Sequence, residues 1–243
     1  MVWRAPGAAK PRRVPWGWVA LGLAGPLAAA IIAFAILQPV KVLPLGEPAP
    51  VFELMGPGGE PFRSHERDGR IVFYFLGMGR DRERTGPLLE AMAATAQALT
   101  DRGWLGRRVE LAFITLDPEH DTPAELARLA RERGLDRFMS AAAGEGPGLS
   151  LLTGSPVAVK LAVGTGFGLY YEPPALVDGT LRFVYQPTVI AVDGGGRVRA
   201  RRPGPPAVAT LVRDAELLVE EADARGASRL LFAGAHLFLC YVP

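Results

Sequence analysis

The chain has 243 residues, which is enough for one sizeable domain and a membrane segment but short for two full domains. Its 27 basic and 25 acidic side chains leave a formal net charge of only +2, so the overall charge gives no case for a nucleic-acid partner. The single cysteine, Cys240, excludes an intramolecular disulfide and a two-cysteine redox motif.

The N-terminal region contains a long uncharged stretch. Residues 14–40 carry no charged side chain, and Arg13 and Lys41 bound them. A helix needs about 20 apolar residues to cross a bilayer, so we expect a transmembrane anchor over 16–40. A cleaved signal peptide is the alternative, with a small-x-small cleavage site at residues 33–35. The apolar stretch is longer than the roughly 7–15 residues typical of such a peptide, which favours the anchor.

Basic residues flank this stretch unequally and predict its direction. Lys41 alone follows it, whereas four basic residues precede it: Arg4, Lys10, Arg12 and Arg13. Because positively charged flanks stay in the cytoplasm, we expect residues 1–15 to form a basic cytoplasmic segment. The rest of the chain is then expected on the periplasmic side of an inner membrane. Residues 41–50 contain three prolines, and we interpret 41–48 as an extended linker.

Apolar patterns predict the strands of the segment that follows, 49–225. A glycine-rich turn at 56–59 lies between two short extended pieces and predicts a β-hairpin. The continuous apolar run at 71–76 predicts a strand that is buried on both faces, and 109–116 and 188–192 are expected to be further buried strands.

Helical spacing and start signals predict the remaining elements. The helices are expected at 87–102, 122–133, 155–164 and 206–225, the second starting at Thr122-Pro123. The charged residues 80–84 and the residues 137–149, rich in glycine, alanine and serine, are expected to be loops. This alternation predicts an α/β fold with a central mixed sheet and helices on both faces.

Three short motifs carry a resemblance to a known family. They read FITLDPEHDTP at 113–123, FLGM at 75–78 and LTGS at 152–155. These motifs are similar to those of the Sco/SenC proteins, membrane-anchored copper chaperones that help to assemble cytochrome c oxidase. The resemblance covers roughly residues 49–225 and implies a thioredoxin-like domain there.

The resemblance fails at the positions that bind copper. The family binds copper through a C-x-x-x-C loop and a distant histidine. Counting from the shared motifs, the two cysteine positions fall on Asp81 and Thr85, and the histidine position falls on Tyr185. A carboxylate, a hydroxyl and a phenol are poor ligands for soft cuprous copper, and they cannot exchange disulfides. We therefore expect no metal site and no cofactor at these positions, and no enzymatic activity.

Pro187 is expected to have a structural role. Gln186-Pro187-Thr188 is similar to the segment in which thioredoxin relatives have a cis-proline beside the active-site loop. The resemblance therefore implies a cis Gln186–Pro187 bond. It also implies that this bond lies close to residues 81–85.

Asp117 and Asp121, both within the motif at 113–123, are likewise expected to be structural. The resemblance implies this role, with Asp121 and Thr122 in positions typical of helix caps. The less favoured alternative is a hard-metal site formed by Asp117, Glu119, His120 and Asp121.

The residues 226–243 form an apolar C-terminal tail. Its apolar run, 230–241, is interrupted by His236 and is too short to span a bilayer. Such a tail either lies on the membrane surface or packs on the domain. Cys240, within it, is either an unreactive thiol or part of a metal site.

These observations favour a non-catalytic, membrane-tethered binding or assembly factor related to cytochrome c oxidase biogenesis. Its partners would be the membrane and a protein such as a respiratory oxidase subunit or assembly factor. Two other hypotheses remain open. The first is a metal-handling protein that uses Cys240 and His236, and the second, ranked lowest, is an enzyme that uses Asp81, Thr85 or Tyr185.

Overall fold

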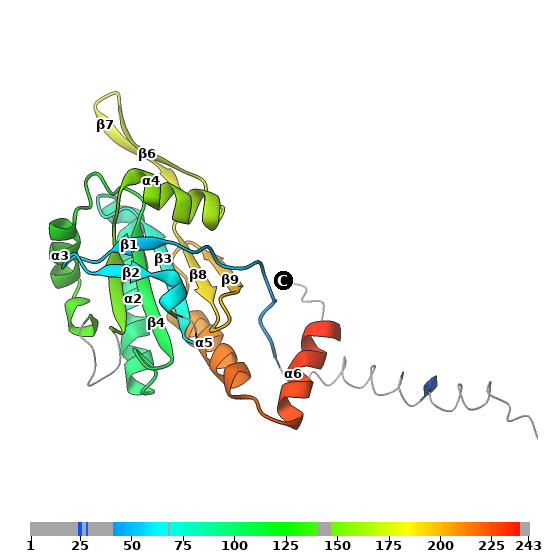
Figure 1. Cartoon of the computed structure of the whole chain (residues 1–243). Helices are drawn as coiled ribbons and strands as arrows, with labels where there is room; N and C mark the ends of the chain where they lie inside the picture. Colours follow the sequence, from blue (N-terminus) through cyan, green and yellow to red (C-terminus); the bar gives the residue numbers. More distant parts are fainter. Residues whose placement is uncertain (1–23, 26–27, 29–40, 68, 140–146, 239–243) are drawn as a thin grey trace, which may run out of the picture.

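A computed structural model describes residues 24, 25, 28, 41–67, 69–139 and 147–238 (Figure 1). No helix within these ranges is long and apolar enough to cross a membrane. The predicted anchor, 16–40, lies outside the described residues except for residues 24, 25 and 28. Cys240 also lies outside them.

A five-stranded mixed sheet forms the centre of the domain. Its order is β5-β4-β3-β8-β9; the strands are β3 (Ile71–Gly77), β4 (Val109–Thr115), β5 (Leu149–Leu152), β8 (Thr188–Val192) and β9 (Val198–Pro203). The first three are parallel, whereas β8 is antiparallel to β3 and β9 is antiparallel to β8. Every residue of β3 and β4 is buried, including Glu110 of β4, whereas the other residues of the two strands are almost all apolar.

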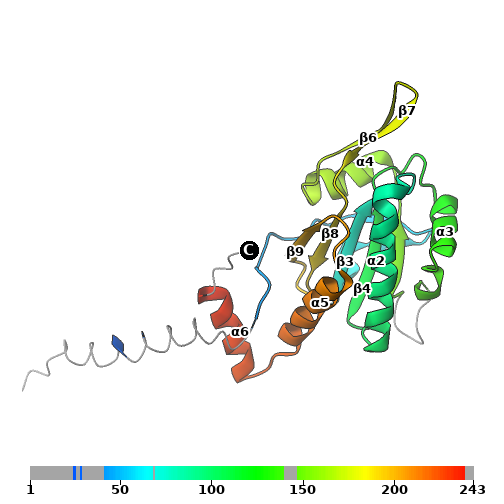
Figure 2. The same ribbon diagram turned by 180° about the vertical axis from the view of Figure 1, so that it is seen from behind.

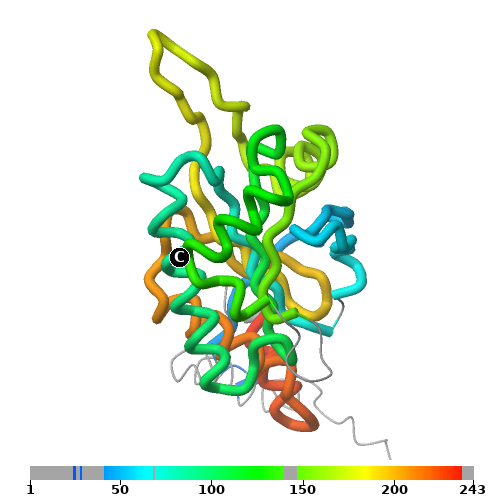
Figure 3. The backbone as a smooth tube through the Cα atoms, turned by 90° about the vertical axis from the view of Figure 1, so that its left-hand side faces the viewer, coloured from blue at the N-terminus to red at the C-terminus, as the bar shows by residue number. Residues whose placement is uncertain are grey.

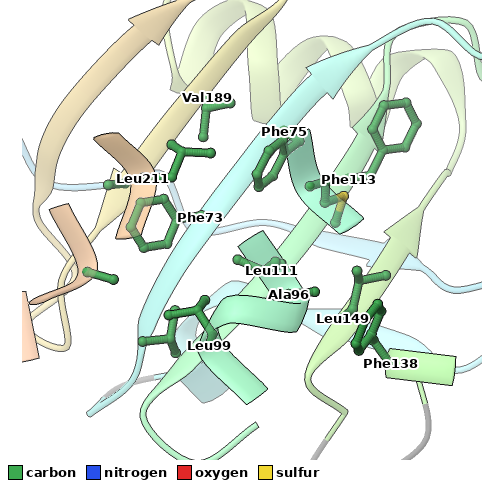
Figure 4. Packing of buried hydrophobic residues seen from close by; sticks show 14 of the residues in the cluster. Phe73, Phe75, Ala96, Leu99, Leu111, Phe113, Phe138, Leu149, Val189 and Leu211 are labelled. Carbon is green, nitrogen blue, oxygen red and sulfur yellow. The ribbon is translucent and has the colours of Figure 1, made fainter. Parts of the chain in front are cut away.

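Three helices cover one face of this sheet (Figure 2): α2 (Arg82–Asp101), α3 (Pro123–Glu132) and α5 (Val208–Asp223). Aromatic side chains of the sheet, among them Phe73, Phe75 and Phe113, pack there against Leu99 of α2 and Leu211 of α5 (Figure 4). This dry interface is one of two cores, and it fixes α2 against β3.

The opposite face is covered by a hairpin and a short helical region. The hairpin consists of β1 (Glu53–Met55) and β2 (Pro61–Arg63), and a 3₁₀ turn at Ser64–Arg67 follows it. The helical region consists of α4 (Pro156–Val159) and a π-helical segment (Lys160–Gly166). Phe52, Phe62, Tyr74 and Phe167 form an aromatic cluster between these layers and the sheet, with ring centroids 5.2–6.4 Å apart.

A second hairpin, which the sequence did not predict, projects from the domain (Figure 3). It consists of β6 (Tyr171–Val177) and β7 (Thr180–Tyr185), which pair only with each other. Most of its side chains are exposed, but Tyr171 and Tyr185 at its base are buried. Because β7 leads directly into β8, the base of this hairpin is fixed at the edge of the core.

Two expected loops are corrected by the structure. Residues 82–84 belong to the first turn of α2, which therefore begins five residues earlier than predicted. Within 137–149 the chain forms a 3₁₀ turn (Asp136–Phe138), and β5 begins at Leu149. The predicted start of α3 is confirmed, because the Thr122 hydroxyl accepts a hydrogen bond from Glu125 N at 3.4 Å.

The described part of the C-terminal tail is helical. It forms α6 (Ala227–Phe238), which follows α5 after a short turn (Figure 1). Phe232 and Ala235 of α6 are buried.

Candidate functional site

The three positions that the sequence comparison singled out lie at the start of α2 and the end of β7. Asp81 is the N-cap of α2, and its Oδ1 accepts a hydrogen bond from Arg84 N at 3.3 Å. Thr85 follows one turn later and is almost completely buried. A Cβ at Gly77, the last residue of β3, would lie only 2.9 Å from the Thr85 hydroxyl. The glycine there allows the helix to start this close to the sheet.

Thr85 and Tyr185 contact each other directly. Their hydroxyl oxygens are 3.0 Å apart, and Thr85 Oγ1 also accepts a hydrogen bond from Met78 N at 3.1 Å. A threonine hydroxyl has one proton and two lone pairs, so both contacts can be satisfied at once. The structure thus brings Thr85 and Tyr185 together, as the comparison with the family implied.

Arg84 completes the site, although no sequence pattern indicates this role. Its Nε lies 2.6 Å from Asp81 Oδ2, and its terminal nitrogens donate to the carbonyl oxygens of Tyr185 and Phe183 at 3.2 and 3.1 Å. The guanidinium carbon lies 4.6 Å from the centroid of the Tyr185 ring. A charged side chain therefore links the first turn of α2 to the last residues of β7.

The phenol of Tyr185 is neutral at physiological pH. Burial raises the pKa of Tyr185 to about 12, and the neighbouring Asp81 carboxylate adds to this effect. The hydrogen bond with Thr85 and the charge of Arg84 oppose the shift without cancelling it. Tyr185 is thus a hydrogen-bonding hydroxyl at neutral pH and not a phenolate ligand.

Asp121 holds the loop after β3 in position. Its Oδ2 accepts hydrogen bonds from Gly79 N at 2.7 Å and from the Thr115 hydroxyl. A Cβ at Gly79 would lie 2.6 Å from Asp121 Oδ1, which explains the glycine. Burial raises the pKa of Asp121, although both hydrogen bonds oppose the shift. Asp121 thus contacts this loop, whereas the helix cap of α3 is Thr122 and not Asp121.

Asp117 forms a charged cluster at the same end of the sheet. Arg80 Nε lies 2.8 Å from its Oδ2, and His120 Nδ1 lies 2.9 Å from its Oδ1. Its backbone N donates to Thr115 Oγ1. Among its described residues, the structure has no group of three or more His, Cys, Asp or Glu residues that could hold a metal ion.

The expected cis bond before Pro187 is wrong. No peptide bond between described residues is cis, and both Gln186 and Pro187 are among them. The expected proximity is right, because Tyr185, two residues earlier, contacts Thr85. Pro187 still has a structural contact, since its carbonyl oxygen accepts from Gly204 N at 2.7 Å.

His236, a ligand in the metal-handling hypothesis, is engaged elsewhere. Its Nε2 lies 2.8 Å from Glu221 Oε1 and 3.4 Å from a terminal nitrogen of Arg199. Cys240, the other ligand of that hypothesis, lies outside the described residues.

The geometry of the site can be set beside what is known of related proteins. The family model for SCO1/SenC proteins matches residues 46–232, most of the chain. The chain belongs to the SCO1/SenC family. A search of curated proteins finds no significant relative for this SCO1/SenC protein.

Solved structures give the same fold. Apo Sco1 of Thermus thermophilus is 26% identical, with a TM-score of 0.54, and the match covers 74% of this chain and 96% of that one. Yeast Sco1 with copper bound is 17% identical, with a TM-score of 0.56 over 81% and 99% of the two chains. BsSco, a member of the Sco family of cytochrome c oxidase assembly proteins, is 15% identical, with a TM-score of 0.59 over 76% and 100%. The predicted α/β, thioredoxin-like fold is thereby confirmed.

Proposed function

We propose that this SCO1/SenC protein is a membrane-anchored, non-catalytic binding or assembly factor in cytochrome c oxidase biogenesis whose family copper site has been lost. The observation that carries the proposal is the contact between Thr85 and Tyr185 beside Asp81. The three positions at which the family resemblance implies two thiolates and an imidazole hold a carboxylate and two hydroxyls. These groups already form hydrogen bonds or an ion pair with other groups of the protein.

The donor chemistry of these residues is unsuitable for cuprous copper. A soft ion prefers sulfur and imidazole ligands, whereas both hydroxyls here are protonated at neutral pH and engaged in hydrogen bonds. The Arg84 guanidinium lies 4.6 Å from the Tyr185 ring, so its positive charge would repel an incoming cation. The same residues contain no thiolate, which supports the absence of thiol–disulfide chemistry at this position.

A role in assembly by contact requires the fold and the location but not the ligands. BsSco belongs to the cytochrome c oxidase assembly proteins, and this chain shares its fold. The uncharged stretch at 14–40 and its four preceding basic residues support a single anchor with the domain on the periplasmic side. The partner would then be a subunit or assembly factor of a respiratory oxidase in the same membrane.

A copper titration tests the loss of the site. The full-length protein in detergent, carrying Cys240→Ser to remove the only thiol, would be titrated with cuprous copper against a competing chelator. We expect no copper to remain bound when the chelator is in excess. One equivalent of chelator-resistant copper would contradict the proposal if it disappeared after Tyr185→Phe, a variant of the candidate site itself.

A genetic test addresses the assembly role. Deletion of the gene should lower the amount of assembled, active cytochrome c oxidase in isolated membranes. Both the wild-type protein and a Thr85→Ala variant should restore it, because the proposed role does not use Thr85 as a ligand. Normal oxidase content in the deletion strain would contradict the assembly role, and restoration by the wild type alone would indicate that the site is used.

A further inference from the structure

The C-terminal helix α6 is apolar on two opposite faces. Phe232 and Ala235 are buried on one side of the helix. On the other side, Leu230 is 75% exposed, and Leu231, which lies between the two faces, is 41% exposed. Ala227 and Ala233 are exposed as well. An exposed apolar face on a helix is typical of a surface that meets a membrane or another protein, and the outer face of α6 is such a surface.

α6 is fixed beside the linker to the predicted membrane anchor. The buried guanidinium of Arg199 donates to the carbonyl oxygens of Leu43 and Pro44 at 2.8 and 3.0 Å and pairs with Glu221 at 2.7 Å. His236 of α6 lies 2.8 Å from the same Glu221 carboxylate. Figures 1 and 2 both show α6 next to the start of the linker.

This arrangement keeps α6 close to the bilayer if the anchor spans it. Leu43 is only the third residue after position 40, the end of the predicted anchor. Three residues reach at most about 11 Å. The start of the linker and the exposed face of α6 thus lie at the same side of the domain.

The charge of the tail is suited to an anionic surface. Residues 224–243 contain no aspartate or glutamate, and Arg225 and Arg229 are exposed just before the apolar residues. Basic side chains beside an exposed apolar face are typical of helices that lie in the interface of a membrane with anionic lipids.

We propose that α6 lies in the interface of the same membrane, with Leu230 and Leu231 inserted among the lipids and Arg225 and Arg229 at the anionic headgroups. The inference rests on the proposed anchor. It gives the domain two attachments to the bilayer, which would restrict its orientation. The hairpin β6–β7 lies at the opposite end of the domain from α6 (Figures 1 and 2), so Tyr185 at its base would face away from the lipid.

Lipid contact can be measured in the full chain with a matched control. Leu230→Cys and Leu176→Cys, each with Cys240→Ser, would carry the same environment-sensitive fluorophore. Both positions are exposed leucines, at 75% and 73%, but Leu176 lies on the distal hairpin. In vesicles of phosphatidylethanolamine and phosphatidylglycerol that contain a spin-labelled quencher lipid, we expect quenching at position 230 at least twice that at position 176. Equal quenching at the two positions would overturn the proposal.

Three further measurements separate the explanations. Alkaline extraction of membranes tests the anchor independently, so a protein that resists extraction but shows no quenching at position 230 contradicts the role of α6 alone. Disulfide cross-linking of Leu230→Cys between two chains, without lipid quenching, would assign the face to a second copy and contradict the lipid partner. Replacing phosphatidylglycerol by a zwitterionic lipid should reduce quenching at position 230, and an unchanged value would contradict the role of the two arginines.

Discussion

The hydroxyl oxygens of Thr85 and Tyr185 lie 3.0 Å apart, although 100 residues separate them in the sequence. This contact joins the start of α2 to the strand that leads into the centre of the sheet. It occupies two of the positions at which the family resemblance implies metal ligands. A hydrogen bond and a cation over an aromatic ring therefore connect the two segments that carry these positions.

The first prediction concerns the strength of this contact. Tyr185→Phe removes the phenol hydroxyl and should lower the free energy of unfolding by about 1 kcal/mol, the usual net value of one hydrogen bond. Urea denaturation of the full-length protein provides the measurement, with Tyr170→Phe, which changes a 69% exposed tyrosine, as the matched control. In a double-mutant cycle with Thr85→Val, the double variant should lose less free energy of unfolding than the sum of the two single losses. Additive losses would mean that the two hydroxyls do not interact.

The second prediction concerns Glu110, which is completely buried in β4. Its carboxylate lies 3.7 Å from Arg67 and from Arg70, and burial raises its pKa above the ordinary value of 4.5 despite both arginines. A carboxyl group with a raised pKa in the folded state contributes stability that is fully present below pH 4.5. This contribution is lost as the pH rises through the folded pKa.

Glu110→Gln removes this ionisation and provides the test. Urea denaturation at each pH gives the free energy of unfolding of the variant and of the wild type. The value for the variant minus the value for the wild type should increase between pH 4 and pH 7. Glu119→Gln, on an exposed residue, should show no such trend. A flat difference for Glu110→Gln would mean that the folded protein holds Glu110 at its ordinary pKa.

The third prediction concerns Asp121. Asp121→Ala leaves Gly79 N and the Thr115 hydroxyl without their acceptor in a buried position. Loss of about 1–3 kcal/mol of unfolding free energy is expected, because buried donors without partners are costly. Glu119→Ala, two residues away and exposed, should change stability by less than about 0.5 kcal/mol. If both variants were equally stable, Asp121 would not hold the loop.

The elements that were predicted correctly have sequence patterns that depend only on residues close together in the chain. The apolar run at 71–76 became β3, and Thr122-Pro123 begins α3. The hairpin β6–β7 was missed because its side chains are mostly exposed and Pro173-Pro174 interrupt any strand pattern. β5 was missed because four residues after a glycine-rich stretch are too few to show a period.

The site was only partly predictable for a related reason. Counting from the motifs gave Asp81, Thr85 and Tyr185, but the role of Arg84 depends on β7, which no sequence signal had indicated. The isomer of the Gln186–Pro187 bond likewise depends on tertiary contacts, because a proline sequence permits both forms. Sequence patterns therefore gave the positions of the side chains along the chain, and the fold determined their partners.

The fourth prediction concerns the direction of the chain in the membrane. Because the basic residues precede the uncharged stretch, alkaline phosphatase fused after Pro243 should be active, since this enzyme folds only outside the cytoplasm. The same fusion without residues 1–40 should be inactive. An inactive fusion of the full chain, made at normal abundance, would contradict the periplasmic location.

The fifth prediction concerns reconstruction of a copper site. Asp81→Cys, Thr85→Cys and Tyr185→His, combined with Cys240→Ser, should create one cuprous site that retains copper against a competing chelator. The backbone brings positions 85 and 185 within contact distance, and a thiol at the N-cap of α2 beside Arg84 would ionise easily. Two thiolates and an imidazole would then be available to one soft ion.

The control for this variant has serine in place of both new cysteines and keeps the new histidine. It should bind no chelator-resistant copper, because only the thiolates are removed. Circular dichroism and urea denaturation establish whether each variant is folded, since Asp81→Cys also removes a helix cap. A folded triple variant without copper would mean that position 81 does not converge with positions 85 and 185. The alignment of the loop with the family motif would then be wrong, and the present site could not be interpreted as a former copper site.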